Sequence, residues 1–223
     1  ATVLSEDIGF SLGPRINAAG RLGESRLVVE LLTSFDRLSA RKLAIRLARY
    51  NEKRKAICDE NLVLARSLLS RQNMTQGRIP AEMVIVSGEM HLGVAGIVAS
   101  KLVELYAVPA VVFSQRFDEK GGLIHVGSAR STEGVDIVGL FSACAPHIKK
   151  YGGHSKAAGL TVCDHSFEVF CQELQKEYLR TAVTGEGRRK TDIVIEVSVE
   201  EVMSGNFLTY YQLLEPFGPG NPA

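Results

Sequence analysis

Several features that mark other classes of protein are missing from this 223-residue sequence. It contains no apolar run that approaches the ~20 residues needed to cross a membrane, and its first residues lack the basic and apolar regions of a signal peptide. Its cysteines have no CxxC spacing and fall within apolar or helical patterns: Cys58, Cys144, Cys163 and Cys171. We therefore expect a cytoplasmic protein with reduced core thiols and no membrane partner.

Net charge is also nearly absent, at +1, but the charges are unevenly spread. Residues 36–71 contain ten basic side chains and four acidic ones, and apolar residues such as Leu43, Leu47 and Tyr50 recur three or four positions apart. This periodicity predicts one long amphipathic helix over residues 36–72. Its basic face is either a path for DNA or, as is common for such runs, a solvated surface.

The rest of the chain alternates between strand-like and helix-like patterns. Strands are predicted over 83–87, 109–114, 123–130 and 157–163, and helices over 94–106, 136–144 and 166–183. This alternation predicts an α/β fold in which a mixed β-sheet is flanked by helices and preceded by the long connecting helix. The flanking regions are predicted to hold a loop at residues 13–20 before a short helix, a linker at 184–191, a strand at 192–199 and a short helix at 206–214.

A Gly-Gly-His segment is the most informative motif of the chain. Gly152 and Gly153 place no Cβ near the backbone, so successive amides can converge on an anion while His154 adds a further donor. The small residues at 157–159 would let the following segment pack closely and hold the predicted loop rigid. The segment therefore indicates a phosphate-binding loop, although a tight turn with a surface histidine would read the same way.

Two further segments carry groups suited to anions. Ser128 and Arg130 close an apolar run, and a guanidinium beside hydroxyl residues matches phosphate oxygens. His91 precedes Gly93 and Gly96 in a strand–loop–helix context, where helix N-terminal amides form an anion site. Each segment also has a plainer interpretation: an edge-strand arginine in a surface ion pair, and glycines that only let a helix pack on a sheet.

Five motifs follow one another along the chain, at residues 13–22, 91–100, 127–131, 152–159 and 215–222. Their order resembles the C-terminal part of bacterial RecJ-type single-stranded-DNA exonucleases, in the DHH phosphoesterase superfamily, over essentially the whole chain. The resemblance implies four parts: the tail of a metal-binding DHH domain at 1–35, a basic connecting helix at 36–72, a DHH-associated substrate-binding domain at 80–183, and a linker with the start of a truncated oligonucleotide-binding region at 184–223.

The same resemblance implies that the metal centre lies outside this chain. The family's Asp-His-His motif does not occur, and the nearest dipeptide, Asp164-His165, is read as a turn leading to a helix. The sequence also offers no cluster of carboxylate and imidazole ligands for a hard cation. We therefore expect no metal in this fragment, manganese or magnesium in the intact protein, and no nuclease activity from the fragment alone.

For the intact enzyme, the resemblance implies 5′-to-3′ hydrolysis of single-stranded DNA in repair and recombination, with a single-stranded-DNA-binding protein as a candidate partner. It implies catalytic roles for Arg130 and His154 beside the reacting phosphate. The implied substrate-binding residues are Ser128, Gly152 and Gly153 at its oxygens, Arg15, Asn17 and Arg21 at neighbouring backbone or the 5′ end, and His91.

Two other functions stay open at this stage. The same Gly-Gly-His segment would suit an enzyme that cleaves very short oligonucleotides or cyclic dinucleotides. Alternatively, the chain is a non-catalytic nucleic-acid-binding module. The segment 215–222 favours the longer nuclease, because in the resembling family it leads into an oligonucleotide-binding barrel, and the presence of Arg130 and His154 argues against a module without catalysis.

Overall fold

The computed structural model describes residues 4–71, 82–183 and 198–213. The chain divides into two compact units: a main unit of residues 14–189, and a smaller one made of residues 1–13 and 190–223. The main unit holds α1 (Gly13–Arg21), α2 (Ser25–Leu32), α3 (Arg37–Arg71), β1 (Val84–Gly88), α4 (Leu92–Tyr106), β2 (Ala110–Phe117), β3 (Leu123–Arg130), α5 (Ile137–Ala143), η2 (Ala145–His147), β4 (Lys150–His154), β5 (Ala157–Cys163) and α6 (Asp164–Val183). The smaller unit holds η1 (Asp7–Leu12), α7 (Val199–Val202) and α8 (Gly205–Gln212).

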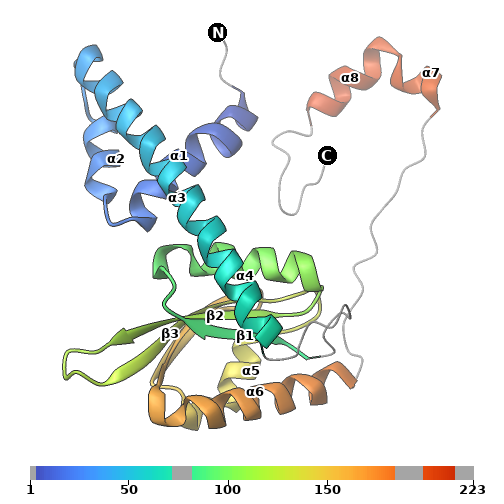
Figure 1. Ribbon diagram of the computed structural model, residues 1–223. Coiled ribbons are helices and arrows are strands. Elements are labelled where there is room, and N and C mark those ends of the chain that lie inside the picture. Colours follow the sequence, from blue (N-terminus) through green and yellow to red (C-terminus); the bar gives the residue numbers. More distant parts are fainter. Residues whose placement is uncertain (1–3, 72–81, 184–197, 214–223) are drawn as a thin grey trace. The chain divides into compact units, whose positions relative to one another are not determined.

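The centre of the main unit is a five-stranded sheet with the order β1-β2-β3-β5-β4 (Figure 1). Strands β1 and β2 are parallel, and the other neighbouring pairs are antiparallel. Strands β1 and β2 can be parallel because α4 forms the crossover between them, whereas a tight turn joins only antiparallel strands. The predicted mixed α/β sheet with a long preceding helix is therefore confirmed.

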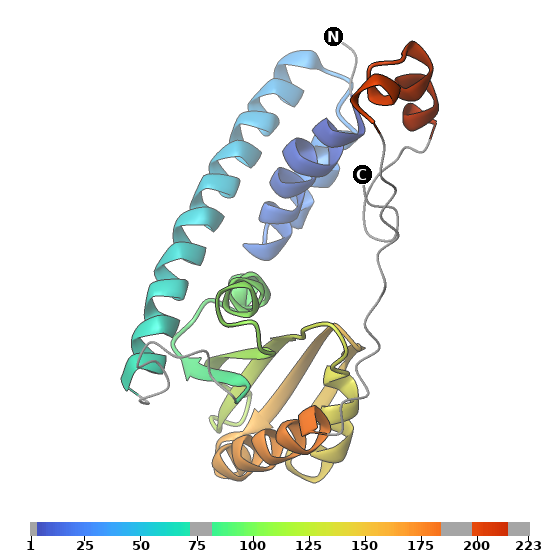
Figure 2. The same ribbon diagram turned by 90° about the vertical axis from the view of Figure 1, so that its right-hand side faces the viewer.

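Helices cover both faces of this sheet, but not evenly. Figure 2 shows α4 on one face and α5 with α6 on the other. On the first face Val94, Val98 and Leu102 of α4 are fully buried in one cluster with apolar residues of α3, β1 and β2. On the second face Phe113 and Phe170 anchor the core. Helix α4 packs mainly on β2 and β3, whereas α5 packs on β4 and β5 from the opposite side. The face of β4 and β5 that lies on the α4 side is consequently left open.

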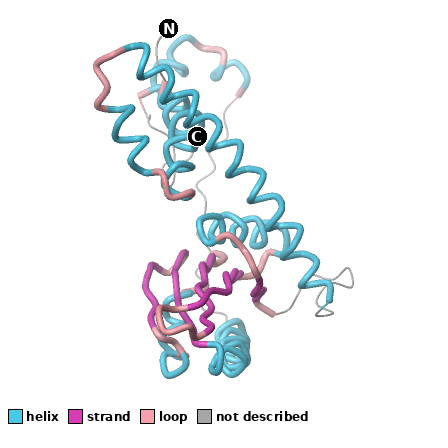
Figure 3. The backbone as a smooth tube through the Cα atoms, turned by 60° about the vertical axis from the view of Figure 1, so that its left-hand side comes forward, coloured by secondary structure: helices cyan, strands magenta, loops and turns pink. Residues whose placement is uncertain are grey.

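Helix α3 ties the α1–α2 pair to the sheet. It contacts α2 near its start and α4 further along (Figure 3). Its first turn is capped by Asp36, whose carboxylate accepts a hydrogen bond from the Ser39 amide at 2.7 Å. The hydrogen bonds from Ser39 lower the pKa of Asp36, so the cap is charged at neutral pH. The predicted helix over 36–72 thus begins at Arg37 and is described to Arg71.

One polar cluster lies in the core beneath α6. The His125 side chain is almost wholly buried and stacks on Phe167 with ring centroids 3.7 Å apart. Its Nδ1 is 2.7 Å from Ser87 Oγ, and its Nε2 is 2.9 Å from Asp164 Oδ1. Both ring nitrogens are therefore satisfied, as a buried imidazole requires. Asp164 begins α6 directly, two residues earlier than predicted, so Asp164 and His165, read from the sequence as a turn, belong to the helix.

Two predicted loops are wrong. Gly152, Gly153 and His154 belong to strand β4, because their backbones pair with residues 157–159 of β5; the turn falls at Ser155 and Lys156. Residues 13–20, expected as a loop, lie in α1, where Ala18 and Ala19 are fully buried and dock the helix.

The remaining predictions concern the chain's flanks and its cysteines. The predicted strand at 192–199 falls mostly outside the described residues, and its last residue, Val199, begins α7. The short helix predicted at 206–214 is observed as α8. All four cysteines are free, with Cys58 and Cys144 buried. Within the described ranges, no helix has the length and apolar character needed to traverse a lipid bilayer.

Candidate functional site

The Gly-Gly-His and Ser-Ala-Arg motifs meet on the open face of the sheet. His154 pairs with Ala157, and Ala157 pairs with Arg130 on the next strand. Since alternate residues of a strand share a face and adjacent strands lie about 4.8 Å apart, the backbones of His154 and Arg130 are roughly 10 Å apart on one surface. Gly152 and Ser128 are related in the same way through Gly159. The structure therefore brings together two motifs separated by about twenty residues in the chain.

Small side chains keep this face open. Gly152, Gly159 and Thr161 line a hollow of about 300 Å³, with Lys150 at its margin. A Cβ at Gly152 would meet no atom within 4 Å, whereas at Gly153, with φ 147°, it would collide with Ala158. Gly153 is thus required by the hairpin, while Gly152 leaves space above the sheet.

Arg130 is held in place by hydroxyl and carbonyl groups rather than by a carboxylate of the described residues. Its Nη1 donates to the Ala129 carbonyl at 2.8 Å and lies 3.4 Å from Ser128 Oγ. Burial lowers the pKa of Arg130, and the positive charge of Arg21 lowers it further. Among the described residues neither arginine forms an ion pair with an acid. Two neighbouring guanidiniums that repel one another and lack counter-ions constitute a site suited to an anion.

Two glycines of α4 create the space for these arginines. A Cβ at Gly96 would lie 2.8 Å from Nη2 of Arg130 and 3.0 Å from Oγ of Ser128. A Cβ at Gly93 would overlap the backbone carbonyl of Arg21, whose guanidinium in turn donates to the Gly93 carbonyl at 3.2 Å. These glycines therefore admit two different groups: Gly96 faces the sheet and leaves room for the Arg130 side chain, whereas Gly93 faces α1 rather than the sheet.

His91 caps the N-terminus of α4. Its Nδ1 accepts the Gly93 amide at 3.1 Å, and its own amide donates to Asn61 Oδ1 at 2.7 Å. Because Nδ1 acts as the acceptor, the ring proton of the neutral imidazole resides on Nε2, which is left to donate elsewhere. His91 is exposed, so this donor is accessible to solvent.

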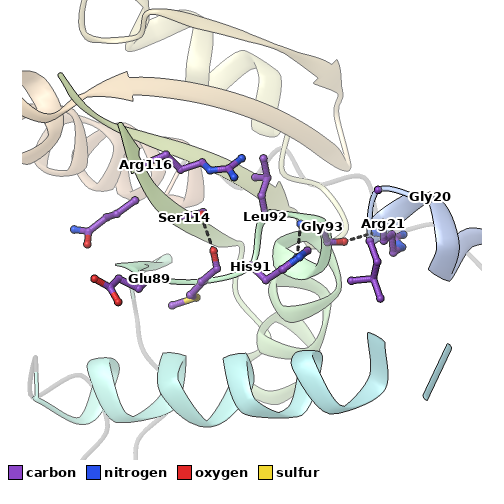
Figure 4. Close-up of a pocket in the computed structure, with 12 residues that line it drawn as sticks. Gly20, Arg21, Glu89, His91, Leu92, Gly93, Ser114 and Arg116 are labelled. Carbon is purple, nitrogen blue, oxygen red and sulfur yellow. Dashed lines mark hydrogen bonds between the residues drawn. The ribbon is translucent and has the colours of Figure 1, made fainter. Parts of the chain in front are cut away.

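A cavity of about 760 Å³ lies between the end of α1, the loop before α4 and strand β2 (Figure 4). Arg21 and His91, two of the predicted substrate-binding residues, line it together with Gly93 and with Arg116 of β2. Sequence reasoning missed Arg116. The alternation of β2 would have found it, since Ser114 and Arg116 follow Val112 on the α4 side, but the strand was expected to end at 114.

A second cavity of about 650 Å³ adjoins the first along α1. Asn17 and Arg21, one helical turn apart, both line it together with Val28 and Leu92. Arg15 lines neither cavity. The structure thus unites Asn17 and Arg21 with His91, and leaves Arg15 on another side of α1.

The described residues do not fit a metal centre. Divalent cations such as Mg²⁺ require several convergent oxygen ligands. No three histidine, cysteine, aspartate or glutamate side chains converge anywhere in the described ranges. The site is built from cations, hydroxyls, amides and glycines, which hold anions.

The sequence of the sheet region matches a known domain family. Its model, the DHHA1 domain, covers residues 80–180.

Residues 80–180 are a DHHA1 domain.

The DHHA1 domain contains β1 to β5 and almost all of α6, so the open sheet face with Arg130 and His154 belongs to it. Arg15, Asn17 and Arg21 lie outside it, on the helix that docks against it.

The chain is homologous to the part of RecJ exonucleases that carries this domain. It is 38% identical over 172 residues to the single-stranded-DNA-specific exonuclease RecJ of Haemophilus influenzae, covering 74% of this chain and 29% of that protein. It is 35% identical over 176 residues to that of Dickeya dadantii, covering 77% and 30%. The match to the Bacillus subtilis protein is 31% identical and covers 95% of this chain and 27% of the relative. The chain therefore spans about a third or less of these relatives' length.

Solved structures agree with the sequence matches. A crystal structure of RecJ in complex with Mg²⁺ from Thermus thermophilus superposes with a TM-score of 0.76 at 28% identity, covering 97% of this chain and 32% of that one. A crystal structure of exonuclease RecJ bound to manganese superposes with a TM-score of 0.64 at 27% identity, covering 83% and 43%. The long helix and the DHHA1 domain are thus found together in RecJ proteins as well.

Proposed function

We propose that this chain is the substrate-binding part of a metal-dependent 5′-to-3′ exonuclease that acts on single-stranded DNA in repair and recombination. The observation that carries the proposal is a pair of arginines, Arg130 and Arg21, that have no acidic partner in the part of the chain that the structure describes. They lie beside an open face that also bears Ser128 and His154. Homology to RecJ exonucleases supports a DNA strand as the anion. The metals would be bound by the part of the intact protein outside this chain, where they would activate water.

The reaction determines what the residues of this chain would do. Cleavage of a phosphodiester develops negative charge on the non-bridging oxygens, so donors fixed there act more strongly on the transition state than on the bound substrate. Arg130 is held by its hydrogen bond to the Ala129 carbonyl, and its guanidinium fits against α4 because Gly96 has no side chain. Together with Ser128 and His154 it would hold the scissile phosphate. Asn17, Arg21 and His91 would hold neighbouring phosphates or the 5′ end in the two cavities.

The test uses the full-length parent protein. Arg130→Ala and His154→Ala should each reduce the single-turnover rate at saturating DNA by on the order of a hundredfold, with a much smaller loss of affinity. Arg21→Ala, which removes a cation that lines both cavities, should instead weaken binding and leave the rate nearly intact. Arg26→Ala removes the same charge from an exposed pair with Glu30 and is the matched control.

The decisive result is the comparison of rate with affinity. Near-normal cleavage rates in both the Arg130 and His154 variants would reduce the open face to a structural feature and refute the proposal. Equal losses in the Arg26 control would show that overall charge, rather than position, is responsible.

A further inference from the structure

A row of four cations runs along α3, at a distance from the site described above. Lys42, Arg46, Arg49 and Lys53 are spaced by four, three and four residues. At 3.6 residues per turn these positions fall within about 60° of one another around the helix, and at 1.5 Å per residue they extend over about 16 Å. All four are exposed. We call these four residues the basic stripe.

The basic stripe faces away from the rest of the main unit. The buried residues of the same helix include Leu47, Asn51 and Cys58. Leu47 belongs to an apolar cluster with residues of α1 and α2, and Cys58 to one with residues of α4. These positions lie on the opposite side of the helix from the stripe, by the same geometry. In Figure 2, α3 runs along the margin of the main unit, with its other helices on one side only.

The charges of the stripe are not compensated within the described residues. Two other cations at this helix are paired, Lys55 with Glu52 at 3.0 Å and Lys101 with Asp59 at 2.9 Å, whereas Arg37, Arg41, Arg66 and Arg71 are exposed and, among the described residues, form no ion pair either. Among the described residues, no member of the stripe forms an ion pair. Lys42 and Arg46 are like charges four residues apart, as are Arg49 and Lys53, and this spacing of like charges destabilises a helix.

Acidic side chains are also missing from the stretch of α3 that follows the Asp36 cap. Residues 37–51, the first four turns of α3, contain five basic side chains and no acidic one. A helix that concentrates cations there, in one row and without internal partners, is suited to an external anion with regularly spaced charges.

We propose that the basic stripe binds the phosphate backbone of single-stranded DNA at a second surface, separate from the open face of the sheet. The inference rests on the proposed function, which supplies DNA as the polyanion. No aromatic side chain belongs to the stripe, so it would grip phosphates and be indifferent to base sequence.

The test measures binding of a fluorescent oligothymidylate to this 223-residue chain by anisotropy at several salt concentrations. The variant carries K42Q, R46Q, R49Q and K53Q. The matched control carries R26Q, K55Q, K101Q and R180Q, which change the net charge equally at exposed cations that already have acidic partners. Circular dichroism verifies that both variants keep their helices.

The stripe variant should bind more weakly, and the slope of log affinity against log salt should fall by up to about 2.8, because each phosphate contact on a single strand contributes about 0.7. The slope of the control should stay within about 0.7 of the wild-type slope, which is the contribution of one phosphate contact. Equal slopes in the two variants, or no measurable binding by the wild-type chain at low salt, would overturn the inference. Binding of polyglutamate with the same affinity and the same dependence on the stripe would also overturn it and assign the surface to an acidic protein.

The outcome of this binding experiment does not depend on whether the proposed catalytic roles are correct. It measures affinity in the isolated chain, whereas the Arg130 and His154 variants measure cleavage in the parent. A normal slope in the stripe variant together with slow cleavage in those variants would reject the stripe alone. The reverse pattern would reject the catalytic roles and leave the stripe as a DNA-binding surface.

Discussion

Replacement of Gly93 by alanine tests the contact between α1 and α4. The added Cβ would overlap the carbonyl oxygen of Arg21 and lie 2.9 Å from its carbonyl carbon. Both of these atoms are backbone, so no side chain can rotate to relieve the clash. Helix α1 must therefore move away from α4, and the hydrogen bond from the Arg21 guanidinium to the Gly93 carbonyl is lost.

The expected cost follows from three terms. Overpacking of a tight contact costs about 1–3 kcal/mol, and loss of the hydrogen bond adds about 1 kcal/mol. Alanine regains up to about 1 kcal/mol over glycine within a helix. We therefore expect Gly93→Ala to lower the free energy of unfolding by about 1–3 kcal/mol. Gly20→Ala is the matched control, because its Cβ would meet only Ser25 Oγ, at an ordinary 3.6 Å, and should be neutral or slightly stabilising.

Urea denaturation of the two variants, followed by circular dichroism, measures these differences. Limited proteolysis of the segment before α3 should also accelerate in Gly93→Ala, because the docking of α1 is what the substitution disturbs. A Gly93→Ala protein as stable as wild type, or more stable than the Gly20→Ala control, would refute this account of the α1–α4 contact.

Two further predictions concern titrating groups. Burial raises the pKa of the Cys171 thiol to about 12 and that of Cys144 to about 11, so a thiol reagent at pH 8 should modify both far more slowly in the folded than in the unfolded protein; equal rates by mass spectrometry would contradict this. Hydrogen bonds from the Gly122 and Lys120 amides lower the pKa of Asp118, so its contribution to the β2–β3 hairpin is present above the ordinary carboxyl pKa and is lost as pH falls through the lowered one. At neutral pH, Asp118→Ala should therefore reduce the hydrogen-exchange protection of the Gly122 amide, measured by NMR, and an unchanged protection factor would rule this role out.

Most of the fold could be predicted from local patterns, because the strands and helices of the sheet region bury regular apolar residues. The helix at 136–144 and the strand at 123–130 are examples. Strand β4 could not be predicted in this way. Gly152 and Gly153 are typical of turns, and what makes them a strand is pairing with β5, with which they form a hairpin. Likewise Ala18 and Ala19 gain their helical role from burial against the rest of the main unit.

The candidate site was only partly accessible from sequence. Ser128, Arg130 and His154 carry recognisable chemistry and were identified from residue type and spacing. Their common face depends on strand order, which places β5 between β3 and β4 and is not local information. The role of Gly96 could not be predicted from local sequence either, because its contact with Arg130 joins residues far apart in the chain. The roles assigned to these residues in catalysis and binding stay predictions.

Strand β4 ends the sheet and is exposed along its whole length, so its outer backbone groups could template the addition of a strand from another molecule. Three features oppose this self-association: the strand has only five residues, Lys149 and Lys150 repel a second copy, and its glycines have low strand propensity. A Cβ at Gly152 would meet no atom within 4 Å, yet a β-branched residue there would make this edge a better template for aggregation. Solubility therefore constrains position 152 independently of any ligand.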